Sequence, residues 1–498
     1  MAYSNVRQSN YRSTTKKTKW LKPAIVKEPR KVCNWSDYQK AIFNDIATGV
    51  GNTHVEALAG SGKTSTIVEG FYYVPKGKTT LMCAFNKSIQ TELETRAPDS
   101  IEVKTIHAIG YAACRRAFPK IGQPDNRKLE GYIKADRGED QETYEVRSNL
   151  AKAISLSKAY LAESAEEIDL IMDKHDVDVC DDPRDNFISS VIKIMKACKA
   201  DTNRVDFDDM VWMPNVHSLE LNKYDMVFID EAQDLNISQI NLALNSVESN
   251  GRIITVADRN QAIYSFRGAD SNAVQNIIDR CKSKTFPLSV TYRCAKNIVE
   301  IAQTIVPTIE SATNAIDGLV ETISENKIEE MAKPGDFILS RTNAPLLKWC
   351  LALLKAGMPA NIQGKDLGKT LSAMIKKSGK KDVDSFLSWL DDWRDVEVER
   401  LTKANRDSSL IEDKAECFKV LCDGTRSLDD VRNNIDRLFH DGDDKDRVIL
   451  STIHKSKGLE RDRVFVLSKT FKLHKNVEEN NIYYVAITRA KNQLYLVQ

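Results

Sequence analysis

Short apolar runs recur along the chain, and a polar or helical stretch follows each of them. The runs lie at 54–58, 79–85, 101–105, 224–229, 252–257, 336–340, 447–451, 463–467 and 494–497. Continuous apolar runs of this length predict strands that are buried on both faces, as in parallel sheets. The intervening segments, such as 87–96, are typical of helices. Alternating strands and helices predict an α/β fold with doubly wound parallel sheets.

Two long segments interrupt this alternation. Both are rich in charged residues, have helical patterns and contain no strand candidate. We therefore predict two α/β cores, each carrying a mainly helical inserted subdomain. The predicted units are core 1 (32–114 and 205–282), insert 1 (115–204), core 2 (283–362 and 443–498) and insert 2 (363–442).

The first residues, 1–31, are polar and basic, with Glu28 as the single acid. Such a composition cannot bury a core, so the sequence predicts a disordered basic tail. The globular pattern begins at Trp35. Ser36 and Gln39 then have the spacing of a helix capping box.

Composition limits the class of protein. A chain of 498 residues with 42% hydrophobic and 29% charged residues is long enough for several globular domains. The net charge of +1 predicts that any nucleic-acid site is a local groove rather than a basic surface. The ten cysteines include no C-x-x-C pair and are expected to be free thiols in a reducing compartment. No run approaches ~20 apolar residues, so we expect no membrane span.

A phosphate-binding loop is the first sign of chemistry. Residues 57–64 read Ala-Leu-Ala-Gly-Ser-Gly-Lys-Thr, which fits a P-loop with alanine in place of the first glycine. The loop follows a predicted strand and opens a predicted helix, the context in which backbone N–H groups cradle phosphates. A flexible turn with a chance lysine is the alternative. Nucleotide contacts are predicted from Ala59, Gly60, Ser61, Gly62, Lys63, Thr64 and Ser65.

An acidic pair ends another buried strand. Residues 227–234 read Val-Phe-Ile-Asp-Glu-Ala-Gln-Asp, so the acids lie at the carboxyl end of a strand, where open α/β sheets hold ligands. We expect Asp230 and Thr64 to hold Mg²⁺, and Glu231 to orient or deprotonate an attacking water. An acidic surface loop is the alternative, and the P-loop earlier in the chain argues against it.

Later segments add aromatic and basic residues that a simple ATPase does not need. They are 256–261, 264–268, 291–293, 340–343, 452–460 and 484–490. In this order the segments resemble superfamily 1 helicases of the UvrD/Rep/PcrA type. Residues 84–89 and 339–344 are similar to F-box DNA helicases and phage-encoded relatives. The resemblance covers 35–498 in motif order, without extending to the sequences of the two inserts.

The resemblance implies two RecA-like cores with ATP and Mg²⁺ bound between them. Gln39 would read the adenine and Tyr292 would stack on it. Arg293 and Arg489, both from core 2, would contact the γ-phosphate as arginine fingers supplied in cis. Gln261 would sense the γ-phosphate. Glu460 would lie near the nucleotide sugar, where Gly458 permits close approach of the backbone.

The resemblance also implies a single-strand path with base-stacking aromatic residues and backbone contacts. Its predicted members are Phe85, Asn86, Thr105, His107, Tyr264, Phe266, Arg267 and Arg341. Stacking suits tracking without sequence preference, because every base offers a π-face. For His107, a core histidine is an equal alternative.

The sequence therefore predicts an ATP-dependent DNA helicase that moves 3′ to 5′ on single strands, in replication, recombination or repair. The alternatives are a translocase that mainly displaces proteins from single strands and a DNA-binding switch with a vestigial ATPase; the intact set of ATPase residues argues against the switch. Expected partners are single-stranded DNA, junctions with duplex, and single-strand-binding or recombinase proteins. We expect a monomeric motor in the cytoplasm, associated with DNA, or in the nucleus of a eukaryotic cell.

Overall fold

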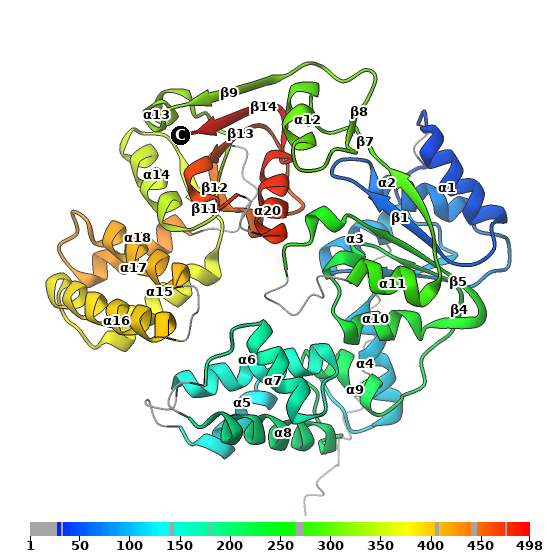
Figure 1. Ribbon diagram of the computed structural model, residues 1–498, viewed down its shortest axis with the longest axis horizontal. Helices are drawn as coiled ribbons and strands as arrows, with labels where there is room; N and C mark the ends of the chain where they lie inside the picture. Colours follow the sequence, from blue (N-terminus) through cyan, green and yellow to red (C-terminus); the bar gives the residue numbers. More distant parts are fainter. Residues whose placement is uncertain are drawn as a thin grey trace, which may run out of the picture.

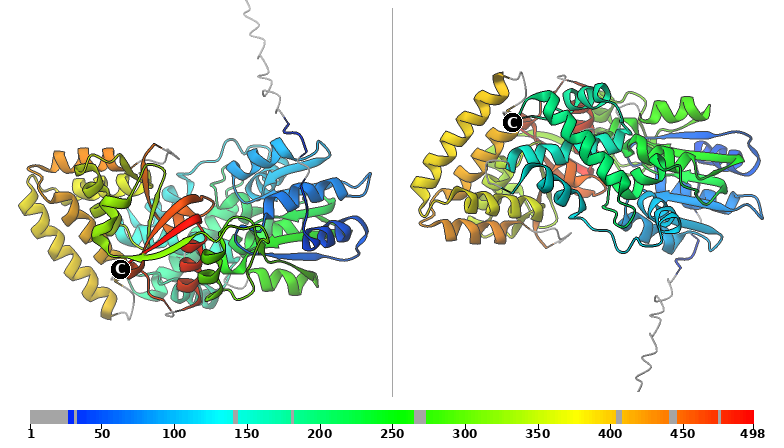
Figure 2. Two further views of the ribbon diagram at one scale, coloured as in Figure 1. Left: turned by 90° about the horizontal axis from the view of Figure 1, so that it is seen from above. Right: turned by 90° about the horizontal axis from the view of Figure 1, so that it is seen from below.

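The computed structural model describes residues 27–30, 33–139, 144–179, 182–264, 273–403, 408–439, 446–473 and 476–498. Core 1, core 2 and two helical units lie around a central gap between ribbons (Figure 1). Seen from above, the core 2 sheet stands between core 1 at one end and the insert 2 helices at the other (Figure 2). No helix among the described residues is long and apolar enough to cross a membrane.

Core 1 is built on a six-stranded, all-parallel sheet with strand order β3-β2-β4-β5-β1-β6. Its strands are β1 (Thr53–Ala57), β2 (Thr80–Ala84), β3 (Ile101–Thr105), β4 (Tyr224–Ile229), β5 (Val247–Ala257) and β6 (Lys284–Leu288). The last of these pairs with β1 although it lies beyond residue 282, where the sequence analysis ended core 1. Its helices are α1 (Asp37–Thr48), α2 (Lys63–Gly70), α3 (Lys87–Arg96), α4 (Ile106–Ala117), α9 (Asp209–Val216), α10 (Ile237–Leu244) and α11 (Ala273–Cys281), with 3₁₀ turns η1 (Phe71–Tyr73), η3 (Ala232–Asp234) and η4 (Arg259–Gln261). The predicted capping box of Ser36 and Gln39 is present at the start of α1.

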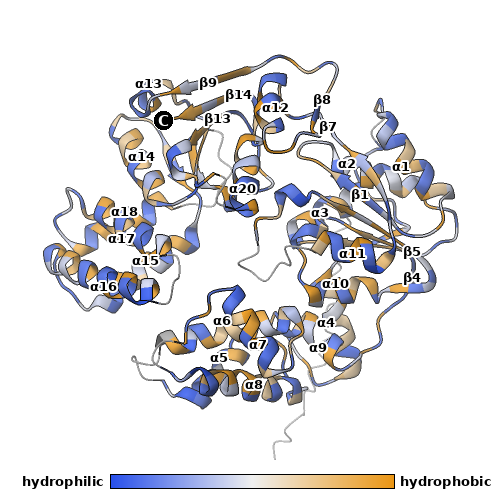
Figure 3. Cartoon of the chain, viewed as in Figure 1, coloured by the Kyte–Doolittle hydropathy of each residue, from blue (hydrophilic) through white to orange (hydrophobic). Residues whose placement is uncertain are grey.

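The apolar runs are continuous because both faces of the sheet are covered. In β4, Val227 and Ile229 pack in the cluster with α4, α10 and α11. Met226 and Phe228 pack in the opposite cluster with α1, α2 and α3. Successive side chains of a strand point to opposite faces, so each face needs its own apolar set. Hydrophobic residues accordingly concentrate along the strands and the inward sides of the helices (Figure 3).

Core 2 repeats this architecture with the strand order β11-β12-β10-β13-β14-β9, again all parallel. Its strands are β9 (Leu319–Ile323), β10 (Phe337–Ser340), β11 (Ala360–Ile362), β12 (Val448–Thr452), β13 (Arg461–Leu467) and β14 (Ala490–Val497). Its helices are α12 (Lys296–Gln303), α13 (Ile328–Met331), α14 (Ala344–Lys355), α19 (Ile453–Ser456) and α20 (Val477–Ile487), with η6 (Glu325–Lys327) and η7 (Ser468–Thr470). A two-stranded ribbon, β7 (Val290–Thr291) with β8 (Glu310–Ser311), lies near the connection between the cores. The prediction of an α/β fold with two parallel-sheet cores is confirmed.

The two inserts are helical. Insert 1 contains α5 (Lys128–Arg137), α6 (Tyr144–Tyr160), α7 (Ala165–Lys174) and α8 (Arg184–Ala200), and insert 2 contains α15 (Lys365–Ser378), α16 (Val383–Lys403), α17 (Ser409–Cys422) and α18 (Leu428–Leu438). Insert 1 shares an apolar cluster with α4 and α9. The cluster of insert 2 is continuous with one face of the core 2 sheet. Asp413 of α17 strengthens this attachment, because its carboxylate accepts the backbone N–H groups of Asn343 and Ala344 at the start of α14.

Residues 27–30, at the end of the segment predicted as a basic tail, lie against core 1. Arg30 forms a bidentate ion pair with Glu69 of α2, and its guanidinium lies 4.4 Å from the centre of the Tyr72 ring. Lys27 donates to the carbonyls of Glu94 and Ala97 at the end of α3. These lysine and arginine side chains are held because they satisfy a buried carboxylate and the last carbonyls of a helix.

Candidate nucleotide site between the two cores

The P-loop joins β1 to α2 with the backbone turned inward. Gly60 and Gly62 have φ values of 72° and 81°, in the left-handed region that glycine adopts freely. A Cβ on Gly60 would lie 2.4 Å from the Thr291 hydroxyl and 2.6 Å from Cβ of Arg293, so this position also needs glycine for close packing. The Ser61 hydroxyl is buried and has no hydrogen-bond partner among the described residues. An unsatisfied buried hydroxyl in an inward-turned loop fits a polar ligand such as a phosphate.

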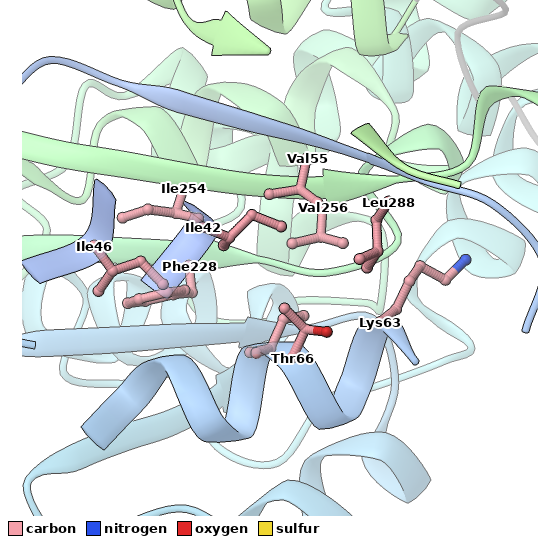
Figure 4. A pocket seen from close by; sticks show the side chains of 10 residues that line it. Ile42, Ile46, Val55, Lys63, Thr66, Phe228, Ile254, Val256 and Leu288 are labelled. Atoms are coloured by element: carbon pink, nitrogen blue, oxygen red, sulfur yellow. The ribbon is translucent and has the colours of Figure 1, made fainter. Parts of the chain in front are cut away.

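The P-loop helix α2 packs against apolar side chains of core 1. Side chains of α1 and four strands surround a small cavity beside the first turns of α2, and Lys63 lies at its edge with the ammonium directed away (Figure 4). The lining residues are Ile42, Ile46, Val55, Lys63, Thr66, Ile67, Phe228, Ile254, Val256 and Leu288. This packing fixes the direction in which Lys63 leaves the helix.

Asp230 and Glu231 follow β4 beside Lys63. The Lys63 ammonium lies 3.5 Å from Oε2 of Glu231, and Gln233 donates to the same oxygen at 2.5 Å. Glu231 has a φ of 50°, and its backbone N–H donates to Oδ1 of Asp230 at 2.9 Å. A non-glycine residue in this conformation costs free energy, and such residues cluster at functional sites.

Burial and neighbouring charges move the pKa values of the two acids in opposite directions. Burial raises the pKa of Asp230, and the Glu231 charge raises it further, to about 7. Burial also disfavours the Glu231 anion, but the charges of Lys63 and Lys457 outweigh it and hold the pKa of Glu231 at about 2. The Lys63 pKa is raised because Glu231, Asp258 and Asp230 outweigh its burial. Glu231 is therefore the ionised member of the pair. A bound cation would favour the ionised form of Asp230 as well.

Gln261 belongs to a hydrogen-bonded chain at the end of β5. Its amide donates to Oδ2 of Asp258 at 2.6 Å, and the backbone N–H of Asp258 donates to Oε1 of Gln233 at 3.2 Å. Burial raises the pKa of Asp258 to about 6. Gln233, which also holds Glu231, therefore links the ends of β4 and β5.

Core 2 supplies two arginines close to this cluster. Arg293 lies against the P-loop through Gly60, and its guanidinium pairs with Glu460 at 2.5 Å and donates to the carbonyl of Thr488 at 3.2 Å. Arg489 is 1% exposed and donates to the carbonyls of Val485 and Leu459. Burial, together with the charge of Arg293, lowers the pKa of Arg489 to about 9. Both arginines are thus held by acceptors in core 2.

The residues predicted around the base and sugar take different positions. Tyr292 is half exposed, and its backbone N–H donates to the Gly60 carbonyl at 2.9 Å. Gln39 is buried; its amide donates to the Thr66 hydroxyl and accepts from the Ser36 N–H. Glu460 pairs with Lys491 as well as Arg293, and the arginine and lysine lower its pKa despite burial. Gly458 has a φ of 88°, and Thr64 and Ser65 lie in the first turn of α2.

Direct contacts join the two cores at this site. The Lys457 ammonium lies 2.6 Å from the Asp234 carboxylate and donates to the Gln261 carbonyl at 2.8 Å. The Ala59 N–H donates to the Tyr484 hydroxyl at 3.0 Å. The Lys457–Asp234 pair is almost fully buried, so removing one partner would leave an uncompensated charge.

The residues predicted to contact DNA are spread over the ends of several strands. Asn86 and Thr105 cap the N-termini of α3 and α4. Phe85 packs partly against the α10 and α11 face of core 1. Arg341 of core 2 is held in a bidentate pair with Glu479. The two caps fix the backbone where α3 and α4 begin.

Two further predicted residues, His107 and Tyr264, lie near the junctions of core 1. His107 stacks on Phe207, with ring centres 3.9 Å apart. Tyr264 donates its hydroxyl proton to the His454 carbonyl at 3.0 Å, and the Lys457 ammonium lies 5.0 Å from its ring centre. Phe266 and Arg267 lie outside the described residues.

Sequence reasoning missed the contacts of Lys457, Tyr484 and Phe207 with distant parts of the chain. Lys457 and Tyr484 stand inside motifs that the sequence singled out, but no local pattern shows that they cross to core 1. Phe207 stands between Asp206 and Asp208, and an aromatic residue flanked by acids at the end of a helical segment was the available signal.

Two family models and several curated proteins match this chain. The family model described as the UvrD/REP helicase N-terminal domain matches residues 37–282, and that of the UvrD-like helicase C-terminal domain matches residues 369–498. F-box DNA helicase protein 1 of Schizosaccharomyces pombe is 25% identical over 492 residues, covering 89% of this chain and 55% of that protein. F-box DNA helicase 1 of Gallus gallus is 22% identical, covering 89% and 47%.

The ATP-dependent DNA helicase Rep of Escherichia coli is 26% identical over 288 residues, which cover 51% of this chain and 40% of Rep. The chain spans about half the length of the curated relatives it matches. The first match covers core 1 with insert 1, and the second covers most of insert 2 and the later part of core 2, in the order N-terminal then C-terminal domain of the same family. The chain belongs to the UvrD/REP helicase family.

Proposed function

We propose that this protein is an ATP-dependent DNA helicase that translocates 3′ to 5′ on single-stranded DNA. One observation carries the proposal: a P-loop lysine and an acidic pair on core 1 lie beside Arg293 of core 2, which in turn is close to the buried Arg489. Phosphoryl transfer needs positive charge around the transferred group, and a site between two bodies can couple that transfer to their movement. The names of the relatives as DNA helicases support the nucleic-acid partner, and the polarity rests on resemblance to the family.

The residues of core 1 fit MgATP. The inward-turned Gly60 and Gly62 and the orphaned Ser61 hydroxyl suit a polyphosphate, and Lys63 would contact its β- and γ-phosphates. Asp230 and the Thr64 hydroxyl would hold the metal. The raised pKa of Asp230 supports this role, because a divalent cation favours its charged form. Bound Mg²⁺ would neutralise charge on the phosphate oxygens.

Glu231 would orient the attacking water and take its proton. Its carboxylate is ionised, and Lys63 and Gln233 fix its position. With a pKa of about 2 in the absence of nucleotide, it is a weak base. Engagement of Lys63 by phosphate would remove one of the charges that lower this pKa, so substrate binding would make Glu231 a stronger base. Gln261, hydrogen-bonded to Asp258, would sense the γ-phosphate.

Arg293 and Arg489 would stabilise the charge that develops in the transition state. Arg489 is hydrogen-bonded inside core 2, so we propose that cleft closure exchanges these carbonyl acceptors for phosphate oxygens. Tyr292 would stack on the base, Gln39 would read it, and Glu460 would contact the sugar beside Gly458. The Lys457–Asp234 pair would transmit closure, since both residues adjoin the segments that surround the nucleotide.

The strand would run over the carboxyl ends of both sheets. Phe85, Tyr264 and Phe207 offer aromatic rings, and Asn86, Thr105 and Arg341 lie at loop positions suited to backbone contacts. Phe207 joins the predicted set because it is 55% exposed and stacks on His107. Stacking by rings contributes ~1–3 kcal/mol per base without sequence preference.

Two assays test the proposal. Steady-state ATPase activity should be stimulated by single-stranded DNA, and partial duplexes with a 3′ single-stranded tail should be unwound faster than those with a 5′ tail. No ATP hydrolysis would contradict the enzyme. Faster unwinding from the 5′ tail would overturn the polarity, and removal of bound protein without strand displacement would favour the translocase alternative.

A further inference from the structure

The 3₁₀ turn η4 of core 1, which carries Gln261, is hydrogen-bonded to core 2 through its carbonyl groups. The Asn481 side-chain amide of α20 donates to the carbonyls of Arg259 and Ala262, each at 3.3 Å. The Lys457 ammonium donates to the Gln261 carbonyl at 2.8 Å. Asn481 is buried, and in Figure 1 its helix lies on the side of core 2 that faces core 1. A turn bonded in this way would follow core 2 when the cores move, unless core 1 holds it as well.

Core 1 holds the same turn through Glu56, the last residue but one of β1. The Glu56 carboxylate accepts the backbone N–H of Arg259 at 3.2 Å on Oε1. Its other oxygen, Oε2, accepts the Nε–H of the Arg259 side chain at 2.8 Å. One carboxylate therefore holds both the backbone and the side chain of the residue that begins η4. Because β1 leads directly into the P-loop, this pair ties the turn to the strand that positions the phosphate-binding loop.

Glu56 is itself fixed on the sheet. The ring of the buried His54 has Nε2 3.4 Å from Oε2 of Glu56 and Nδ1 2.9 Å from the Thr255 hydroxyl of the neighbouring strand β5. Burial favours the neutral form of Glu56, but the hydrogen bond with His54 and the charge of Arg259 outweigh it and lower the Glu56 pKa. The carboxylate is therefore ionised at neutral pH, and charge-assisted hydrogen bonds are the stronger kind.

Gln261 depends on the conformation of this turn. Its side chain is buried and donates to Oδ2 of Asp258 at 2.6 Å, while the Asn260 N–H donates to Oδ1 of the same carboxylate at 3.1 Å. These partners all belong to the turn or to the residue before it. The direction of the Gln261 amide is therefore set by where the turn is held, and displacement of a group by 1 Å can cost about 10²-fold in rate.

We propose that Glu56 and Asn481 are positioning residues for Gln261, which anchor its turn to the P-loop strand and to core 2 respectively. The inference rests on the proposed function and deepens it, because it names side chains through which core movement would reach the γ-phosphate. With both anchors made, Gln261 is aligned for hydrolysis. When core 2 moves away, the bonds of Asn481 are lost and Glu56 alone keeps the turn on core 1.

The first test separates kcat from nucleotide affinity. Glu56→Gln keeps the size of the side chain but loses its charge, and Asn481→Ala removes the bonds from core 2. In each variant we expect kcat of the DNA-stimulated ATPase to fall by about 10–100-fold, because Gln261 is no longer held in place. The Kd of a fluorescent ATP analogue should stay within about threefold of wild type, since neither residue contacts the nucleotide.

Each variant has a matched control in the same core. Glu102→Gln alters a carboxylate on β3 of the core 1 sheet, which accepts from the Tyr224 hydroxyl at 2.6 Å. Asn492→Ala alters an exposed amide of core 2, which donates to Asp462 at 3.2 Å. Both controls should keep kcat and Kd at the wild-type values. Circular dichroism melting reports folding, and Arg259→Lys replaces Glu56→Gln as the core 1 variant if the latter does not fold.

The second test asks whether the two anchors act through Gln261. In a Gln261→Ala background, single-turnover hydrolysis should be slowed no further by Glu56→Gln or by Asn481→Ala, because no amide is left to position. A merely structural role of either residue would slow hydrolysis by the same factor with and without the Gln261 side chain. Equal factors in the two backgrounds would therefore overturn the inference.

The remaining outcomes separate this inference from the proposed function. Wild-type kcat in either variant, in a protein that hydrolyses ATP with DNA stimulation, would overturn the role of that residue and leave the proposed function standing. A loss confined to nucleotide affinity in Glu56→Gln would show that this residue holds the P-loop instead of the turn. Wild-type protein without ATP hydrolysis would contradict the proposed function itself.

Discussion

The two walls of the nucleotide site are organised differently. On core 1, Lys63 follows β1 and Glu231 follows β4 of the same sheet. The Lys63 ammonium lies 3.5 Å from the Glu231 carboxylate. On core 2, Arg293 and Arg489 are engaged by acceptors of their own core. The groups of the first wall thus already contact each other, whereas in the proposed mechanism the arginines of the second wall exchange their partners for phosphate. This difference suits an enzyme that binds nucleotide with one core and hydrolyses it only when the other core closes.

Loss of Lys63 should have the largest effect, because it removes the only cation placed at the centre of the core 1 wall in the described structure. We expect Lys63→Ala to have no measurable ATPase activity and to leave Glu231 without its closest positive charge. A coupled assay of phosphate release checks this. Lys40→Ala, at an exposed position of α1, is the control. Turnover of Lys63→Ala within a factor of about ten of wild type would refute the assignment of Lys63 to the nucleotide site.

Glu231→Gln separates binding from hydrolysis within the same wall. The amide keeps the size of the side chain but cannot take a proton, so we expect kcat to fall by about 10²–10⁴ while nucleotide still binds. Binding of a fluorescent ATP analogue and single-turnover hydrolysis measure the two quantities. Normal turnover in Glu231→Gln would remove this residue from the chemistry.

Lys457→Met should weaken the contact between the two cores without removing the nucleotide-site residues of either core. It leaves Asp234 buried and unpaired, and it frees the Gln261 carbonyl that Lys457 now contacts. We expect stimulation of the ATPase by single-stranded DNA to fall by about tenfold, the effect of a modest coupling free energy between two sites. Lys455→Met, an exposed neighbour, is the control. If stimulation survived intact in Lys457→Met, closure would have to be transmitted elsewhere.

Arg30→Ala should have the smallest effect, and it should lower only the free energy of unfolding. It removes the partner of the buried Glu69 on the back of the P-loop helix. Because Arg30 is half exposed, we expect the free energy of unfolding to fall by only about 1 kcal/mol. Urea denaturation measures this change, and kcat should stay at the wild-type value. A lowered kcat would show that residues 27–30 contribute to the core 1 wall.

The sequence predicted most of the two sheets, because strands buried on both faces are continuously apolar. It missed β6 and β9, which are the edge strands on one side of each sheet. The residues of β6 are mostly exposed and include Pro287, and those of β9 include Glu321. An edge strand lacks a neighbour on one side and is less covered, so its pattern resembles that of a loop. β11 was missed because it spans only Ala360–Ile362.

The residues of the site divide in a similar way. Some are predicted by their local sequence, and others make contacts that depend on how distant segments pack. Lys63, Asp230 and Glu231 could be predicted because phosphate and metal chemistry demand fixed residue types next to strands. The partners of Arg489 could not, because Val485 and Leu459 become its acceptors only when α20 and the start of β13 pack together.

The most direct test of the difference between the walls is the affinity of Arg489→Ala for ATP, measured beside its kcat. A fluorescent ATP analogue gives Kd, phosphate release gives kcat, and circular dichroism verifies the fold. The predicted result is a Kd within about threefold of wild type with kcat lowered by about 10³ or more, since the arginine acts only in the transition state. A rise in Kd that accounts for the whole loss of kcat/KM would contradict this, because Arg489 would then bind the ground state as Lys63 does.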